Sequence, residues 1–497
     1  MSEHFISRQD AEKDLLSCAA YLGERINSID GHAEAMIAVV PQYLAQGNVD
    51  LAAELSNTID DPFTRDRLLI AVAETCAAKD DDEYAFQLAD AVEDPGLRIQ
   101  AFESIGLQKA AKGQFDKARE VASSMPHPDG VLVGVAVRQA ADGFEDDAMK
   151  TIDEIEHAGA AITALIEIAM RKLQSDDAEK AITFLEQAVE ESDDIEHREE
   201  QARARCDIGN AFVEAGRNDK AIETFDKARE TAETIDNIHR DAFLSLTAQG
   251  FLHAGSLDLA DRTLDLVKDK THMASALLGY SREFWKQDKK DDALESLEEA
   301  FAILESQHER ETRDQKSRFR LLTTIAAQFA GFERGERAIQ VAEGIKDEQQ
   351  RTAALSQVAS ILALRKEDEQ ASQAYRAITE DSDRVFALIG MSDSKEKNED
   401  QAGATELLSE ASHLSETVPQ LTMRATAYVE IGKRYLSFGE AEKAREAFSA
   451  SVDTTAQIRD ESARVTTLVS LVEATAGSDI DLSDFPGRLL QQGARSA

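Results

Sequence analysis

Proline, tryptophan and aromatic residues are scarce in this sequence. Its 497 residues include seven prolines and one tryptophan, and 6% are aromatic. Strands of β-sandwiches draw on aromatic and β-branched side chains, so a series of sandwich domains is disfavoured. The chain is instead rich in Ala, Glu, Leu, Gln, Arg and Lys, which favour helices. We therefore expect an all-α protein, too long for a single compact core.

Cysteine is also rare. Cys18, Cys76 and Cys206 lie far apart, without a CxxC pair or a Cys/His ligand spacing. A disulfide framework and a zinc site are therefore not expected, and the three thiols are predicted to be buried in a reducing compartment. The N-terminus has no basic and apolar leader pattern, and no run of about 18 apolar residues occurs. A soluble, cytoplasmic protein is expected.

Basic residues are outnumbered. The chain has 55 Lys and Arg against 96 Asp and Glu, which gives a net charge of −41. This charge would repel phosphate backbones and anionic lipids, so neither nucleic acid nor a membrane is an expected partner. Two interpretations of the acidity stay open. It is either a halophilic adaptation that keeps the surface hydrated, or a field that attracts basic partners.

What the chain has in abundance is a repeated alanine pattern. A helix is followed by a second helix that contains the alanine, and apolar residues recur about four and seven positions later. Intervals of 30 to 45 residues, most often 33, separate these alanines, which is typical of a helical solenoid. The positions are Ala52, Ala85, Ala118, Ala148, Ala181, Ala221, Ala260, Ala293, Ala338, Ala371, Ala444 and one at Ala402 or Ala404.

The pattern has a physical reason. Where two antiparallel helices cross closely, a methyl group is the largest side chain that fits. In six of the twelve units a glycine stands five residues before the alanine, for example Gly216 before Ala221. Glycine adopts the left-handed conformation that ends a helix, so each unit is predicted to be one helix hairpin.

Residues 202–235 resemble a tetratricopeptide repeat. Ile208-Gly209, Phe212, Gly216, Ala221, Phe225 and Ala228 follow that family's order and spacing, and Ile431-Gly432, Tyr435, Gly439, Ala444 and Phe448 form a second match. The family's tryptophan in the first helix and its closing proline are missing. The resemblance implies a right-handed superhelical α-solenoid of about twelve antiparallel hairpins. A HEAT or armadillo-type solenoid is the alternative, favoured by the longer units.

The domain organisation follows from where the repeats begin and end. Residues 1–31 are expected to form an N-terminal capping helix, 32–458 the repeat array and 459–477 a C-terminal capping helix that lacks a partner. The segment 478–497 loses the periodicity and is expected to be a flexible tail.

Signatures of catalysis are missing from the sequence. No Walker loop, GxSxG turn, HExxH helix or EF-hand loop occurs, and the ten histidines are scattered. We therefore expect no enzyme activity, no cofactor and no bound metal.

What remains is a surface. In the family that the chain resembles, the first helices line a concave groove, and its groove positions correspond here to Asn210, Gln249, His253, Arg282, Trp285, Lys286 and Lys433. The same positions include Cys206, Leu252, Leu278 and Leu436. Trp285 could anchor a partner whose acidic group binds Arg282 or Lys286. Alternatively, Trp285 packs between neighbouring hairpins. Asn210 matches the family's carboxylate-clamp asparagine, but Cys206 replaces the clamp lysine, which argues against that ligand mode.

Three functions are consistent with such a surface. The first is a non-catalytic protein–protein interaction scaffold or adaptor that binds a protein or extended peptide on the concave face. The alternative is a regulatory sensor whose superhelix closes on a small ligand or signalling peptide. The third is a hydrolase or lyase hidden in a closed α-toroid, which would need clustered carboxylates.

Overall fold

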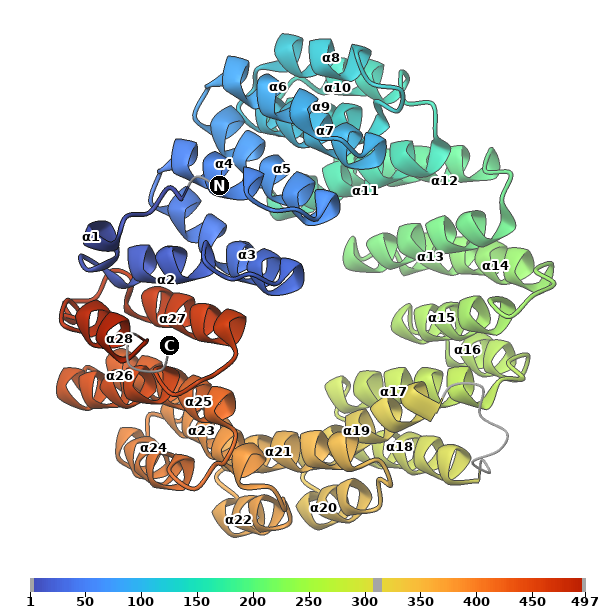
Figure 1. The fold of residues 1–497 in the computed structure, drawn as a ribbon. Coiled ribbons are helices and arrows are strands. Elements are labelled where there is room, and N and C mark those ends of the chain that lie inside the picture. The colour runs from blue at the N-terminus through green and yellow to red at the C-terminus, as the bar shows by residue number, and fades with distance from the viewer. Residues whose placement is uncertain (1–3, 307–314, 494–497) are drawn as a thin grey trace. The chain divides into compact units, whose positions relative to one another are not determined.

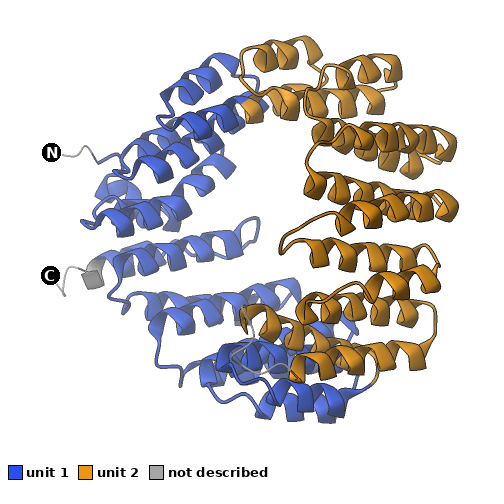
Figure 2. Cartoon of the chain, turned by 90° about the vertical axis from the view of Figure 1, so that its right-hand side faces the viewer, with its two compact units in different colours: residues 1–102, 334–497 blue, residues 103–333 orange. Residues whose placement is uncertain are grey.

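The computed structural model describes residues 4–306 and 315–493, and these residues form 28 helices and no strand. The expected all-α repeat architecture is confirmed. The chain divides into two compact units, which are described separately: unit 1 comprises residues 1–102 and 334–497, and unit 2 comprises residues 103–333 (Figure 2). The boundary at residue 102 falls within α7 (Pro95–Ala111).

Unit 1 contains helices from both ends of the sequence (Figure 1). They are α1 (Arg8–Ala11), α2 (Leu15–Gly23), α3 (Ile29–Ala45), α4 (Val49–Asn57), α5 (Pro62–Ala78), α6 (Asp82–Ala91), α20 (Gly335–Glu343), α21 (Glu348–Leu364), α22 (Asp368–Arg376), α23 (Asp381–Lys397), α24 (Gln401–Ser415), α25 (Leu421–Ser437), α26 (Ala441–Thr455), α27 (Glu461–Thr475) and α28 (Phe485–Gly493).

Unit 2 contains the middle of the sequence. Its helices are α8 (Phe115–Ser123), α9 (Asp129–Ala141), α10 (Glu145–Ile152), α11 (Ala158–Gln174), α12 (Ala178–Asp193), α13 (Arg198–Glu214), α14 (Asn218–Glu233), α15 (Arg240–His253), α16 (Leu257–Leu264), α17 (Lys270–Lys286), α18 (Lys290–Glu305) and α19 (Gln315–Gly331).

From α3 to α26, a first helix alternates with a second helix along the chain. Each of the twelve alanines lies in a second helix, and every one is fully buried. In the eleventh pair the buried residue is Ala404, whereas Ala402 is exposed, which settles the open choice between them. The alanine spacing therefore locates every second helix of the array.

The best repeat shows how closely its helices approach. A Cβ atom added to Gly209 in α13 would lie 2.5 Å from Cε1 of Phe225 in α14, and one added to Gly250 in α15 would lie 2.4 Å from the same atom. The Phe225 ring is thus held between two glycines of consecutive first helices. Because real Cβ contacts are not this short, any larger residue at either glycine would force the helices apart.

Each first helix joins its second helix through a turn of three residues, and the middle residue always has a positive φ. Six of these residues are the expected glycines: Gly47, Gly113, Gly143, Gly216, Gly255 and Gly439. The other six are Asp80, Asp176, Asp288, Glu333, Lys366 and Glu399, with φ between 59° and 65°. The backbone conformation is therefore constant where the residue type is not.

Consecutive hairpins are tied together by acidic residues near the start of some first helices. Asp66 accepts hydrogen bonds from the backbone N–H groups of Glu93 and Asp94, both at 2.8 Å. Asp241 accepts from Lys268 and Asp269 at 2.8 and 2.6 Å, with the same separations of 27 and 28 residues. A carboxylate thereby binds the loop that precedes the next first helix.

An arginine holds the same loop from its other side. Arg98 donates to the carbonyl of Val92 at 2.9 Å, and Arg424 donates to that of Val418 at 2.8 Å. Arg351 and Arg464 make the equivalent bond, six residues back, to Ile345 and Ile458. Because Arg464 follows this pattern, α27 begins as an ordinary first helix.

The two expected capping helices pack against each other within unit 1. Helix α2, expected to cover only the first repeat, contacts both α27 and α3, and α27 contacts α3 directly. Gln42 of α3 donates to Glu473 of α27 at 2.7 Å, and Ser462 donates to Glu34 at 2.6 Å. Helix α27, expected to lack a partner, therefore packs against helices from the other end of the sequence.

Part of the segment 478–497, which was expected to be a flexible tail, forms a helix. Residues 485–493 form α28, and Phe485, Leu489 and Leu490 are buried. Helix α28 contacts α2 and α26. The segment lost the repeat period without losing its amphipathic character, because its apolar residues cover a surface that the repeats leave open.

Candidate partner-binding surface

Six of the seven predicted partner-binding residues lie in unit 2, on the first helices α13, α15 and α17. Asn210, His253, Arg282 and Lys286 are exposed, whereas Gln249 and Trp285 are half-buried. Lys286 lies 3.9 Å from Glu283, and no ion pair of Arg282 occurs among the described residues.

Three other residues at the family's groove positions are buried. Cys206 lies in α13 with its sulfur 3.4 Å from the hydroxyl oxygen of Thr247 in α15. Leu252 and Leu278 are also in the core. Because they are buried, these three side chains are not available to a partner. The groove positions of the tetratricopeptide repeat family therefore include residues that are buried in this chain.

Gln249 is placed by a glycine of the next hairpin. A Cβ atom on Gly279 would lie 2.1 Å from Oε1 of Gln249, so the amide occupies the space above that glycine. Its Nε2 donates to the carbonyl of Ser245 at 3.3 Å. Gln249 is therefore wedged between α15 and α17, with part of its side chain exposed.

Trp285 packs against the next hairpin. Its ring is stacked on that of Phe332, with centroids 4.3 Å apart and planes 10° apart, and Nζ of Lys290 lies 4.9 Å from the indole centroid. Such stacking stabilises the junction between α17 and α19. This geometry agrees with the second of the two interpretations of Trp285.

Lys433 is the seventh predicted residue and lies in unit 1, on α25. It is half-buried, and its Nζ lies 2.8 Å from Glu430. The neighbouring Arg434 pairs with Asp393 of α23 at 3.0 Å. Burial raises the pKa of Glu430, but hydrogen bonds from Lys433 and Arg434 outweigh it, so the net shift is downward. Lys433 is thus engaged in an ion-pair cluster of its own unit.

Sequence reasoning missed three exposed side chains of unit 2. Leu246 of α15 is 49% exposed and lies one turn before Gln249. Arg203 of α13 and Arg320 of α19 are exposed and have no ion pair among the described residues. A scan for apolar or basic residues at an i, i+3 or i+4 spacing from the predicted ones would have found Leu246.

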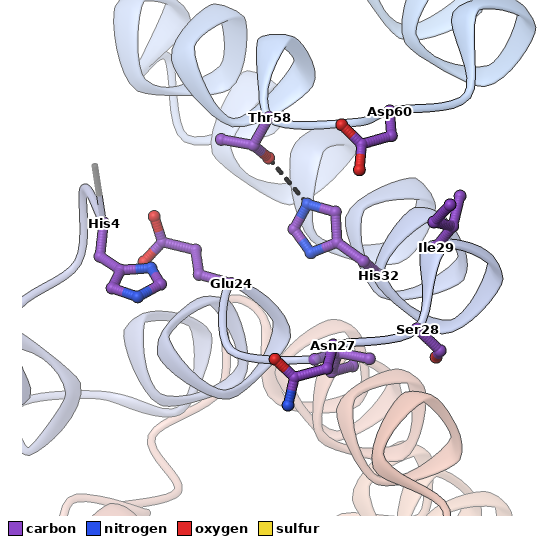
Figure 3. A pocket seen from close by; sticks show the side chains of 9 residues that line it. His4, Glu24, Asn27, Ser28, Ile29, His32, Thr58 and Asp60 are labelled. Carbon is purple, nitrogen blue, oxygen red and sulfur yellow. Dashed lines mark hydrogen bonds between the residues drawn. The ribbon is translucent and has the colours of Figure 1, made fainter. Parts of the chain in front are cut away.

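Unit 1 contains a polar pocket of about 170 Å³ beside the α2–α3 and α4–α5 loops (Figure 3). His32 lies between the Gly23 carbonyl and the Thr58 hydroxyl, 2.9 Å from each. Glu24 accepts from the N–H groups of Phe5 and Ile6 at 2.6 and 3.0 Å. Because the Glu24 carboxylate binds these two backbone N–H groups, it holds the N-terminal segment in place.

The described residues contain no cluster of three or more His, Cys, Asp or Glu side chains arranged to bind a metal ion. All three cysteines are buried and free, as expected. None of the described helices is both long and apolar enough to cross a membrane.

Residues 160–234 match the family model of the tetratricopeptide repeat. They include most of α11 and all of α12, α13 and α14, so the family resemblance is confirmed in this part of the chain. The curated proteins include no match to the sequence.

Several solved structures are similar to this chain at low identity. Ton1535 from Thermococcus onnurineus is 16% identical, over 72% of this chain and 98% of its own, with a TM-score of 0.26. Human IFIT1 is 14% identical over 76% and 97%, with a TM-score of 0.27. A signal-transduction ATPase with a tetratricopeptide repeat sensor from Pyrococcus horikoshii is 14% identical over 74% and 65%, also at 0.27. These TM-scores support no functional inference.

Proposed function

We propose that this chain, whose residues 160–234 match the tetratricopeptide repeat, is a non-catalytic interaction scaffold that binds a protein or an extended peptide on the first helices of its hairpins. Tetratricopeptide-like repeats generally mediate contacts between proteins or act as scaffolds. Arrays of hairpins expose a long surface while each repeat keeps its own core, which suits an extended partner better than a small ligand.

The observation that supports this proposal most strongly is that Arg282 is exposed and has no ion pair among the described residues. The chain nevertheless has 41 more acidic than basic residues. Leu246 and Asn210 add exposed apolar and amide groups on the two preceding first helices. An exposed guanidinium on one first helix and an exposed leucine on the preceding one suit a segment that combines an acidic and an apolar side chain.

Reversing this charge tests the proposal. The double variant Arg282→Glu with Lys286→Glu should lose at least about tenfold of the partner captured from native extract, because like charges would face the partner's acid. The control is Arg262→Glu on α16, a second helix, where Arg262 is 69% exposed and, in the described part of the chain, pairs with Asp258 alone. Mass spectrometry quantifies the captured proteins, and melting temperatures show that all three chains are folded.

Two results would overturn the proposal. One is equal capture of the same proteins by the double variant and by the Arg262→Glu control. The other is an extract and a peptide library that both yield no partner for the unmodified chain.

A further inference from the structure

Helix α2 has the residue pattern of a second helix. Ala19 lies 33 residues before Ala52, which is the commonest interval of the array. Leu22, Gly23 and Ile26 follow Ala19 at the same positions that Leu55, Ser56 and Ile59 take after Ala52. Ala19 is fully buried, like every other alanine of the series. Helix α2 therefore has the pattern of the second helix of a repeat, and the structure shows which first helix it packs against.

That first helix is α27. Its Asp460 caps the helix by accepting from the N–H of Ala463 at 3.0 Å, and Arg464 binds the preceding loop, as in the complete repeats. A Cβ on Gly23 would lie 3.9 Å from Cγ1 of Val465 and 3.3 Å from Cβ of Ala35 in α3. Helix α2 thus lies against both α27 and the following first helix, which is the place of a second helix (Figure 1).

In addition to α27, the C-terminal helix α28 also contacts α2. Ile480, Leu482 and Ser483 line a cavity of about 330 Å³ together with Leu15 and Leu16. Among the described residues, no side-chain hydrogen bond or ion pair joins α2 to α27 or to α28. Apolar contacts alone therefore hold α2 against the C-terminal segment.

The chain connectivity of this repeat differs from that of the others. Every other second helix follows its first helix after a turn of three residues, whereas nothing links α27 to α2 directly. Apart from the N-terminal segment that precedes it, helix α2 is connected along the chain only to α3, through residues 24–28, and Nδ1 of His32 lies 2.9 Å from the Gly23 carbonyl oxygen at this junction. An apolar contact without a covalent turn separates at a lower free-energy cost than a connected hairpin.

We propose that residues 4–23 act as a reversible clasp: α2 leaves its place against α27, α3 and α28, pivots on residues 24–28, and returns, while the rest of unit 1 stays folded. Release uncovers the apolar face of α27 around Val465, and the same α2 is the segment that covers it again. The clasp is a conformational device built on a repeat whose two helices come from opposite ends of the chain.

The native cysteines of the full-length protein test this. Burial raises the pKa of Cys18 in α2 to about 12 and the pKa of Cys206 in α13 to about 11. At pH 8, alkylation by iodoacetamide therefore reports opening, which returns each thiol to an ordinary pKa. Without urea, Cys18 should react at least about tenfold faster than Cys206, and its rate should depend less on urea because a local opening exposes less surface.

Two variants identify the contact that opens. In Gly23→Cys with Val465→Cys, the oxidised form should slow alkylation of Cys18 to the rate of Cys206, and reduction should restore it. Ala19→Leu should accelerate alkylation of Cys18, because leucine is too large for the fully buried site of Ala19 and would loosen the packing of α2. Its matched control, Ala221→Leu in α14, should leave the Cys18 rate unchanged. If the disulfide variant fails to fold, the Ala19 and Ala221 pair decides.

The clasp is overturned if Cys18 and Cys206 react at the same rate with the same dependence on urea, because α2 would then open only with the whole fold. An Ala19→Leu chain whose Cys18 reacts no faster than in the unmodified protein would equally overturn it. Neither result depends on a binding partner, so the failure of the clasp is separate from the failure of the proposed scaffold.

Discussion

Individual residues show that turn conformation is conserved along the chain even where glycine is not. Twelve turns have a left-handed residue, and at six of them Asp, Glu or Lys adopts it. For an L-residue this conformation costs about 1–2 kcal/mol, because Cβ approaches the following carbonyl oxygen. These six turns therefore carry strain that the surrounding helix contacts offset.

Replacing one of these residues should relieve the strain. Lys366 is exposed, with φ 64°, in the turn between α21 and α22. Lys366→Gly should stabilise the protein by about 0.5–1 kcal/mol, since the relief exceeds the added chain entropy of glycine. The urea-unfolding midpoint measures the change. The control is Gly216→Ala at φ 69°, where a Cβ would meet nothing within 4 Å, so backbone strain alone should lower the midpoint. A lower midpoint for Lys366→Gly would contradict the strain.

The glycines of the sequence predicted six of the twelve turns. The other six could be located only by counting back five residues from the repeated alanine. Asp80 and Lys366 occupy the place of the missing glycines, five residues before Ala85 and Ala371. Aspartate is one of the few non-glycine residues that is enriched in left-handed backbone, but lysine is not, so at Lys366 the residue type alone pointed away from the turn. The buried alanine that follows is the better signal, because a core contact tolerates fewer substitutions than an exposed turn.

At the scale of helices, consecutive hairpins are joined by carboxylates that bind backbone N–H groups. Burial raises the pKa of Asp241, but bonds from the N–H groups of Asp269 and Lys268, and from Arg240, lower it by more. The net pKa is lowered, so this contact stabilises the fold above the unfolded-state pKa of about 3.9 and is lost as pH falls through the folded-state value.

The pH dependence of an amide variant checks this sign. Asp241→Asn should lower the free energy of unfolding by about 1–3 kcal/mol at pH 7, because two N–H groups lose a charged acceptor. The difference from the unmodified protein should shrink as pH falls toward 3. Urea titrations across this range measure it, with Asp258→Asn as the control, since Asp258 is 71% exposed and pairs with Arg262 only within its helix. A difference that stays constant with pH would refute the assignment.

The candidate surface was less predictable than the helices that carry it. The family positions located Asn210 and Arg282 on exposed faces, because the spacing within a first helix follows the helix period. The same family positions also include Cys206 and Leu278, which are buried. Whether a position faces solvent or the next hairpin depends on how far consecutive first helices approach. Glycines allow the close approach here: Gly250 lies against Phe225, and Gly279 lies against Gln249. In both cases the glycine belongs to the repeat that follows.

At the scale of the whole molecule, the residues that the structure describes form thirteen helix pairs once α27 is paired with α2. The sequence indicates that α2 is a second helix, because Ala19 keeps the interval and the apolar spacing of the array. The partner of α2 was not predictable, because α27 lies at the other end of the chain and no local signal links them. Packing within unit 1 determines that pairing.

A rearranged chain would show whether α27 and α2 are one repeat. Residues 27–477 followed by 13–26 would place α2 directly after α27. The new turn would contain Gly477, which already has φ 74°, and Asp14, which already caps α2 by accepting from Ser17 at 2.7 Å. The rearranged chain should unfold at a urea concentration at least as high as residues 13–477 in native order, because a short turn costs less entropy to close. Residues 27–477 alone should unfold earlier, since Val465 and its neighbours on α27 lose their cover. If the rearranged chain were no more stable than residues 27–477, then α2 would not be acting as the second helix of α27.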